Sequence, residues 1–156
     1  MDEPATEMSV PLDSDGFLRR ECPTCEREFK WLSSPEGEGE PGPEGGYYCP
    51  YCAIQAPPGS WFTAAQIELA QNTLMREVIG PELDKMSNDL RRSSQGSLIS
   101  FDMKYDKPRA FDPLVESNDM CRFDFQCHPA EPVKVLEDWG RPVHCLICGN
   151  PTGATT

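Results

Sequence analysis

The stretch of sequence that decides the fold runs from Cys22-Pro-Thr-Cys25 to Cys49-Pro-Tyr-Cys52. Two residues separate the cysteines of each pair, and this spacing forms a tight turn, or knuckle, that directs both sulfur atoms at one point. Two knuckles together supply four thiolates in the tetrahedral arrangement that Zn²⁺ prefers. We therefore predict that Cys22, Cys25, Cys49 and Cys52 form a first metal site.

The alternative to a metal site is a pair of disulfides, and the redox compartment decides between the two. The chain starts Met1-Asp-Glu-Pro-Ala-Thr-Glu7, with neither a basic start nor an apolar run of signal-peptide length. No later stretch approaches the roughly 20 apolar residues that a membrane span requires. We therefore expect a cytoplasmic protein with reduced cysteines and no membrane partner.

Short strand candidates, which alternate between apolar and polar residues or carry aromatic ones, surround the knuckles: Phe17 to Glu21, Phe29 to Trp31, and Tyr47-Tyr48. Knuckles flanked by such strand candidates over residues 16–56 resemble the zinc-ribbon family. The resemblance implies a small β-structure held together by a structural zinc ion. It implies no particular activity, because this fold hosts many functions.

A rubredoxin-like iron site, and with it an electron carrier, is an alternative for the first site, since four thiolates also hold iron. Rubredoxin-like chains usually have glycine after each knuckle, whereas this chain has Glu26 and Ala53. Because neither residue favours a left-handed turn, these two knuckles are expected to close in some other way. Zinc is therefore the preferred prediction.

The C-terminal part holds a second group of candidate ligands, but only Cys145-Leu-Ile-Cys148 is a complete knuckle. The remaining candidates are Cys121, Cys127, His128 and His144. If residues 122–126 form a strand at about 3.3 Å per residue, Cys121 and Cys127 lie on the order of 20 Å apart. Those two cysteines then cannot share one ion.

An internal repeat selects among these candidates. In both halves a first group of ligands precedes an alternating segment with a central lysine, and a complete knuckle follows. The alternating segments are Phe29-Lys-Trp31 and Val133-Lys-Val135. The repeat predicts a second site formed by Cys127, His128, Cys145 and Cys148, with a turn at Pro129 to present the adjacent ligands. His144 is the reserve ligand, and Cys121 is expected to be a small buried side chain.

The middle of the chain predicts helices. Thr63 and Gln66 have the spacing of a capping box, and apolar residues follow at helical intervals. Gly80-Pro81 should break or sharply kink this helix, and a second helix should continue to about Arg92. Residues 99–105 alternate between apolar and polar side chains, and this pattern predicts a strand with one buried face.

These elements predict an α+β protein in which two zinc-ribbon modules, with two Zn²⁺ per chain, are joined by a central helical pair. Its expected parts are a disordered acidic N-terminus (1–15), an N-terminal ribbon (16–56), a helical connector (60–93), a C-terminal β-rich zinc-binding module (97–150) and a flexible tail (151–156).

The net charge and the motifs restrict the classes of function that the chain can have. A net charge of −12 disfavours general binding to nucleic acid or anionic membranes. A local basic and aromatic cluster is the candidate binding surface: Arg19, Arg20, Arg27, Lys30 and Trp31. Zinc deaminases have a histidine, a glutamate two residues later and a Pro-Cys-x-x-Cys further on. The match here is loose, because Glu131 stands three residues after His128 and His144 occupies the position of the proline. We therefore expect a non-enzymatic protein-interaction module or accessory subunit, with a nucleic-acid-binding ribbon as the alternative.

Overall fold

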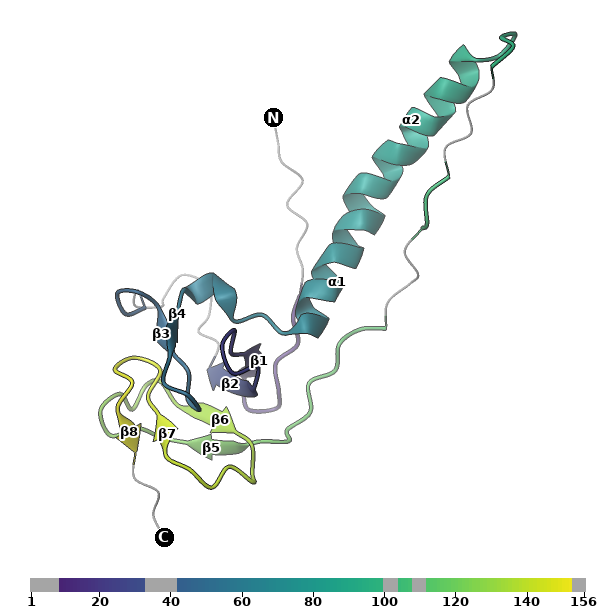
Figure 1. Cartoon of the computed structure of the whole chain (residues 1–156). Helices are drawn as coiled ribbons and strands as arrows, with labels where there is room; N and C mark the ends of the chain where they lie inside the picture. Colours follow the sequence, from purple (N-terminus) through teal and green to yellow (C-terminus); the bar gives the residue numbers. More distant parts are fainter. Residues whose placement is uncertain (1–8, 33–41, 100–103, 108–111, 153–156) are drawn as a thin grey trace. The chain divides into compact units, whose positions relative to one another are not determined.

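The computed structural model describes residues 9–32, 42–99, 104–107 and 112–152 (Figure 1). The chain divides into two compact units. Val10–Ala64 and Leu114–Thr156 together form one of them, which we call the sheet unit. The segment Ala65–Pro113 belongs to the other, which we call the helical unit. None of the described helices is both long and apolar enough to span a membrane.

The sheet unit is built around one antiparallel sheet of four strands in the order β1-β2-β6-β5. These strands are β1 (Phe17–Glu21), β2 (Glu28–Leu32), β5 (Cys121–Phe123) and β6 (Val133–Val135). Two further strand pairs carry the complete C-terminal knuckle of each half: β3 (Tyr47–Tyr48) with β4 (Gln55–Ala56), and β7 (Val143–His144) with β8 (Pro151–Thr152). The architecture is thus mixed, with a helix and small antiparallel sheets.

The two predicted ribbons are not separate modules, because strands from both halves belong to the same sheet. At its centre β2 pairs with β6, with Lys30 opposite Lys134. The link is repeated near the knuckles, where the Tyr48 N–H donates to the Leu146 carbonyl and the His144 N–H donates to the Pro50 carbonyl, both at 2.9 Å. Pairing removes an open sheet edge from each half and makes one folded body.

One face of the sheet supplies the apolar core. Phe29 and Val133 are fully buried on it, together with Trp61 from the segment that follows β4. The rings of Phe29 and Trp61 pack edge to face, with centroids 5.6 Å apart. This aromatic packing anchors the knuckles against the sheet.

The other face carries buried charge. The ammonium groups of Lys30 and Lys134 both contact Asp13 Oδ2, at 3.2 and 2.8 Å, and all three side chains are almost completely buried. Asp15 contacts Lys134 Nζ at 2.6 Å. The sequence assigned residues 1–15 to a disordered segment; residues 1–8 lie outside the described part, and Asp13 instead covers this face of the sheet. Similarly, the predicted flexible tail begins with β8.

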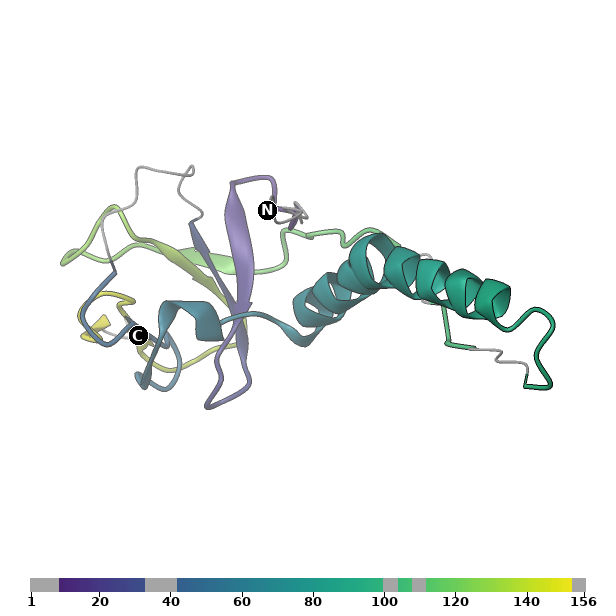
Figure 2. The same ribbon diagram turned by 90° about the horizontal axis from the view of Figure 1, so that it is seen from above.

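The helical unit contains α1 (Ala64–Leu74), a π-helical turn (Met75–Ile79) and α2 (Gly80–Ser93). Figure 2 shows an uninterrupted rod, so the predicted break at Gly80-Pro81 and the helical pair are not seen. The Gly80 N–H donates to the Met75 carbonyl five residues earlier. This wider turn accommodates the missing N–H and the ring of Pro81 without ending the helix. A Cβ atom on Gly80 would lie 2.7 Å from the Met75 carbonyl oxygen, which explains the glycine.

The chain returns past α2 after its C-terminal end. The Tyr105 hydroxyl lies 3.1 Å from both the Gly80 carbonyl and the Asp84 carboxylate, and Lys107 pairs with Asp84 at 3.6 Å. Most of the strand predicted over residues 99–105 lies outside the described residues, and its described ends form no strand.

Candidate metal centres

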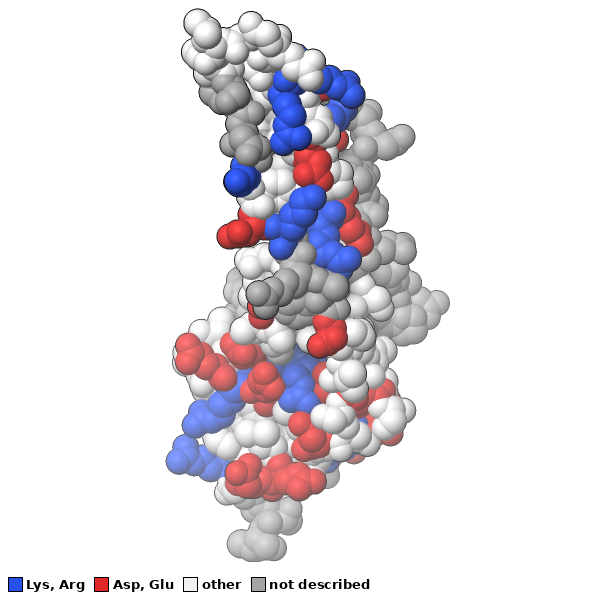
Figure 3. Space-filling view, turned by 90° about the vertical axis from the view of Figure 1, so that its right-hand side faces the viewer, with Lys and Arg blue, Asp and Glu red and all other residues white. Residues whose placement is uncertain are grey.

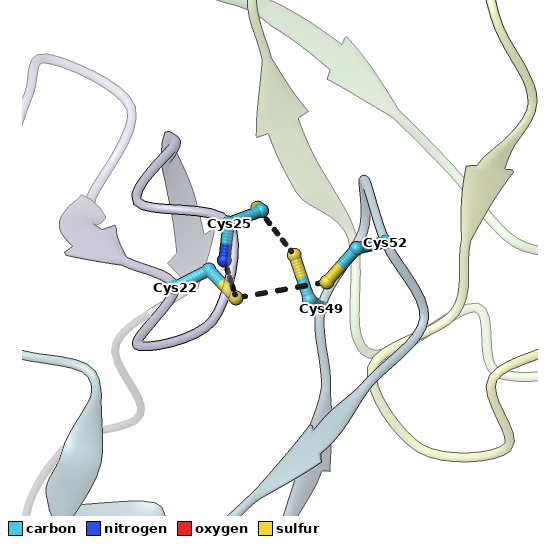
Figure 4. A group of neighbouring side chains, drawn as sticks. All are labelled: Cys22, Cys25, Cys49 and Cys52. Carbon is cyan, nitrogen blue, oxygen red and sulfur yellow. Dashed lines mark hydrogen bonds between the residues drawn. The ribbon is translucent and has the colours of Figure 1, made fainter.

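The first group of cysteines converges on one point from two strand pairs (Figure 4). Cys22 and Cys25 lie between β1 and β2, and Cys49 and Cys52 lie between β3 and β4. The sulfur atoms of Cys22 and Cys52 are 3.7 Å apart, as are those of Cys25 and Cys49. All four sulfur atoms lie within 4.8 Å of one another, so this group could hold a metal ion.

Backbone amides prepare these sulfurs for negative charge. The N–H groups of Thr24 and Cys25 both donate to Cys22 Sγ at 3.4 Å, and the Tyr51 N–H donates to Cys49 Sγ at the same distance. Burial by itself raises the pKa of Cys22, but these amide donors outweigh it and lower the pKa below its ordinary value. At Cys49 burial prevails and raises the pKa. A bound cation would supply the remaining stabilisation of four adjacent thiolates.

All three complete knuckles close with the same backbone conformation. Glu26, Ala53 and Gly149 follow the second cysteine of their knuckles, with φ angles of 58°, 59° and 70°. Their N–H groups donate to the carbonyls of the first cysteines at 2.9–3.0 Å. The expectation that the first two knuckles close in some other way was therefore wrong. The sulfur-binding turn imposes the left-handed conformation on residues that disfavour it.

Replacing Ala53 by glycine should stabilise the sheet unit by about 1 kcal/mol, because glycine adopts a positive φ without the steric penalty of a Cβ atom. Thermal denaturation in zinc-containing buffer would measure the change. Ala56→Gly is the matched control, since Ala56 lies in β4 and has no positive φ. The control should lower the melting temperature, and a lower temperature for Ala53→Gly as well would contradict the prediction.

The second group combines the complete knuckle Cys145–Cys148 with two adjacent side chains. The Sγ atom of Cys145 lies 3.4 Å from His128 Nδ1, and the sulfur atoms of Cys148 and Cys127 are 3.5 Å apart. The four ligand atoms lie within 4.8 Å of one another, so this group too could hold a metal ion. The Glu131 N–H donates to the His128 carbonyl at 3.1 Å and closes the turn that presents the pair.

Cys121 and the reserve ligand His144 lie outside this group. Cys121 is in β5 opposite Val135 and is exposed, so the expectation that it is buried was wrong. It begins β5, one of the two edge strands of the sheet, and the first two residues of this strand are exposed. His144 Nδ1 lies 3.1 Å from the Pro50 carbonyl oxygen, where the ring helps to join the two knuckles. Neither residue belongs to a ligand group among the described residues.

The predicted basic cluster is divided between the two faces of the sheet. Arg19 pairs with Glu28, Glu116 and Asp119 at 2.6–2.8 Å. Lys30 is buried on this same face. On the opposite face the Arg20 guanidinium stacks between the rings of Trp31 and Phe62, and burial lowers its pKa to about 10. Figure 3 shows acidic and basic side chains interspersed on the side it views, with no single basic patch.

Sequence reasoning missed two arrangements of charged residues. The first is the Asp13–Lys30–Lys134 cluster, whose one sequence signal is the lysine at the centre of both repeated segments. The second is Trp139, whose ring is stacked by Arg27 at 5.1 Å and by Arg141 at 5.5 Å. Nothing in the spacing of these last residues indicates that they meet.

Comparison with known proteins gives no match: no family model fits the chain, and none of the curated proteins or solved structures resembles it closely enough to count. The class of protein therefore rests on the site geometry. Two cysteine-rich groups that could each hold a metal ion are consistent with zinc-ribbon-like modules.

Proposed function

We propose that the chain is a non-enzymatic protein with two structural Zn²⁺ ions, which acts as a protein-interaction module or as an accessory subunit of a larger complex. The observation that supports this proposal is the convergence of two separate sets of four ligand atoms, each within 4.8 Å. One set contains four sulfurs and the other three sulfurs and one imidazole nitrogen, and both are common donor sets of structural zinc.

The number of ligands favours a structural role over a catalytic one. A catalytic zinc normally keeps one coordination position for water or substrate, whereas four protein ligands complete a tetrahedron. In the first site all four ligands would be cysteines. In the second site Cys127 and His128 would supply the third and fourth ligands beside Cys145 and Cys148. The ions would then stabilise a unit whose four-stranded sheet has strands of only three to five residues.

Metal content is the direct test. Native mass spectrometry and elemental analysis of the full chain should find two zinc ions per chain and a colourless protein. The variant Cys121→Ser should bind the same amount, because Cys121 lies outside both groups. A red protein containing iron would favour the rubredoxin-like alternative, and a folded protein with no metal would overturn the proposal.

A protein partner is favoured by the net charge of −12, which opposes long-range attraction to phosphate backbones. One observation favours the nucleic-acid alternative: Arg27 and Arg141 are exposed and stack on a half-buried tryptophan, Trp139. Arginine and tryptophan surfaces of this kind bind stacked bases and phosphates.

Fluorescence anisotropy with labelled single-stranded DNA and RNA at physiological salt separates these alternatives. We expect no saturable binding below about 1 μM, since even non-specific nucleic-acid binding has a Kd of roughly 1–100 μM at physiological salt. Tight binding that Arg27→Glu and Arg141→Glu abolish would replace the protein-interaction proposal with the nucleic-acid one. Chemical cross-linking in the native host, followed by mass spectrometry, would identify protein partners.

A further inference from the structure

The two ligand groups differ in how far their sulfur ligands are shielded from solvent. All four cysteines of the first group are buried or half-buried: Cys22, Cys25, Cys49 and Cys52. In the second group Cys145 is buried and Cys148 is half-buried, whereas Cys127 is exposed. Among the described ligands of both groups, Cys127 is therefore the sulfur that a solute reaches first.

The exposure of Cys127 follows from the segment that presents it. Phe125 is almost completely buried and fixes this segment on the apolar core, but the turn after it runs along the surface, where Gln126 and Pro129 are exposed. The complete knuckle of the same group packs on the core through Leu146, which is also almost completely buried. The second group is thus covered on the side of its knuckle and exposed on the side of Cys127.

Two surface hollows share Cys127 in their lining. One has a volume of about 510 Å³ and also contains Gln126 and Asn150. The other has a volume of about 280 Å³ and also contains His128 and Glu131. A hollow of roughly 10–15 Å³ already holds a water molecule. A small polar oxidant such as hydrogen peroxide can therefore reach Cys127 from either hollow.

A second sulfur lies close to that of Cys127. The Sγ atoms of Cys127 and Cys148 are 3.5 Å apart, closer than the 3.7 Å between the paired sulfurs of the first group. A disulfide bond is about 2.05 Å long, so these two atoms need to approach each other by roughly 1.5 Å. Movement of the exposed turn at Cys127 can supply this approach without displacing the buried core. Cysteines that sense oxidants are typically accessible thiolates with such a second cysteine beside them.

We propose that Cys127 and Cys148 are a site of reversible oxidation by peroxide, and that the disulfide between them releases the ion of the second group. This inference rests on the proposed function, because a bound cation keeps both thiols deprotonated and the thiolate is the form that reacts with peroxide. The first group should be spared at first, since all of its cysteines are at least partly shielded.

The oxidation proceeds in two steps. The Cys127 thiolate attacks one oxygen of hydrogen peroxide, the O–O bond breaks, and the sulfur becomes a sulfenic acid while hydroxide leaves. The Cys148 thiolate then attacks the Cys127 sulfur and displaces a second hydroxide, so that the S–S bond forms. The two sulfurs together lose two electrons, and the peroxide is reduced to two hydroxide ions, which take up two protons from solvent and become water.

The disulfide removes two of the four ligands of the second group. Its sulfurs carry no negative charge, and the thiolate is the form of cysteine that binds metal. His128 and Cys145 remain, and two ligands are too few for the four-coordinate arrangement of structural zinc. Reduction of the disulfide regenerates both thiols, so the site can bind zinc again.

Treatment of the zinc-loaded full chain with hydrogen peroxide, followed by alkylation of free thiols and peptide mapping, tests this assignment. The first disulfide to appear should join Cys127 to Cys148, and zinc release, followed with a chromogenic chelator, should rise in step with it. Dithiothreitol and added zinc should restore the metal content. Cys121→Ser is the matched control, because Cys121 is exposed but lies outside both groups. This variant should form the same disulfide at the wild-type rate.

Cys127→His isolates the role of the exposed sulfur. It keeps four ligands, two histidines and two cysteines, which are a common donor set of structural zinc. Peroxide should release zinc from it at least about tenfold more slowly than from the wild type. If this variant does not fold, the peptide map of the wild-type protein decides alone.

Three results with the zinc-loaded wild type would overturn the inference and leave the proposed function intact. They are a first disulfide within the first group, a first disulfide between Cys145 and Cys148, and zinc release without any disulfide. A chain that holds no zinc before treatment would overturn the proposed function and the inference together.

Discussion

Replacing either Cys49 or Cys145 by alanine is expected to release both of the proposed Zn²⁺ ions and to unfold the whole sheet unit. Each substitution removes a buried ligand from one site only. However, β2 and β6 pair at the centre of one sheet, and the knuckles exchange two backbone hydrogen bonds. Described strands of both halves form one sheet and no separate module around each proposed ion, so the loss of one ion should remove the support of the other.

The expected magnitude is large. A structural zinc ion contributes an apparent 10–16 kcal/mol, roughly, whereas the whole free energy of unfolding of a domain is about 5–15 kcal/mol. The free energy lost with one site is therefore larger than the free energy that the remaining interactions contribute to folding. Native mass spectrometry should show zero zinc ions for each variant, and near-UV circular dichroism should lose the tryptophan signal.

Cys121→Ala is the matched control, because it removes an exposed cysteine that belongs to neither ligand group. It should retain two ions and the wild-type spectrum. If Cys145→Ala instead kept one zinc ion and a native near-UV spectrum, the sites would be independent and the single-body interpretation would be wrong.

The second large effect is expected for Asp13→Asn, which should destabilise the sheet unit by roughly 3–5 kcal/mol, the usual effect of breaking a buried ion pair. Asp13 Oδ2 lies between two buried ammonium groups, those of Lys30 and Lys134. Asparagine keeps the shape and the oxygen that accepts the Phe17 N–H. The substitution therefore removes the negative charge and puts an NH2 donor where Oδ2 accepts from both ammonium groups. The two lysines, which face each other across β2 and β6, then repel each other.

The pH at which this effect is measured matters. Burial by itself would raise the pKa of Asp13, but hydrogen bonds from Lys134, the Phe17 and Asp15 amides and Lys30 outweigh it and hold the pKa well below its ordinary value of 3.8. A carboxylate whose pKa falls on folding stabilises the protein fully above the ordinary value, and the contribution is lost as the pH falls below it. Chemical denaturation at pH 7 in zinc-containing buffer thus records the whole contribution.

The same substitution at an exposed ion pair provides the control. Asp124 pairs with Arg122 at 2.9 Å, and both side chains are more than half exposed. Asp124→Asn should change the free energy of unfolding by less than about 1 kcal/mol. In the double variant with Lys134→Gln, the effect of Asp13→Asn should shrink, because one of the repelling charges is gone. Equal effects for Asp13→Asn and Asp124→Asn would show that the buried cluster has no special role.

Much of the candidate site could be predicted from the sequence, because the signal is local. A Cys-x-x-Cys pair defines its own knuckle, and the structure brings together the eight side chains that the spacing and the repeat indicate. Even Cys127 and His128, adjacent residues that cannot share one side of a strand, could be paired with Cys145 from the order of the repeat. The turn at Pro129 follows from the same argument.

The helix shows where local reasoning was insufficient. Thr63 directly precedes α1, as the capping spacing predicts. Gly80-Pro81 is a strong break signal in a regular α-helix, because proline lacks an N–H and clashes with the preceding turn. The π-helical turn before it removes that clash. The choice between a break and a wider turn depends on packing around Gly80, including the Tyr105 hydroxyl 25 residues away.

The sequence by itself thus determined the candidate ligand groups: which cysteines and which histidine gather, in what order, and that alternating segments would flank them. Only the tertiary structure decided that β2 and β6 join both halves in one sheet, that Asp13 lies between Lys30 and Lys134, and that a π-helical turn carries the helix past Gly80-Pro81. The physical reason is distance along the chain. Knuckle geometry is set by bonds within a few residues, whereas the pairing of strands separated by about a hundred residues depends on which edges and charges meet after the chain has folded.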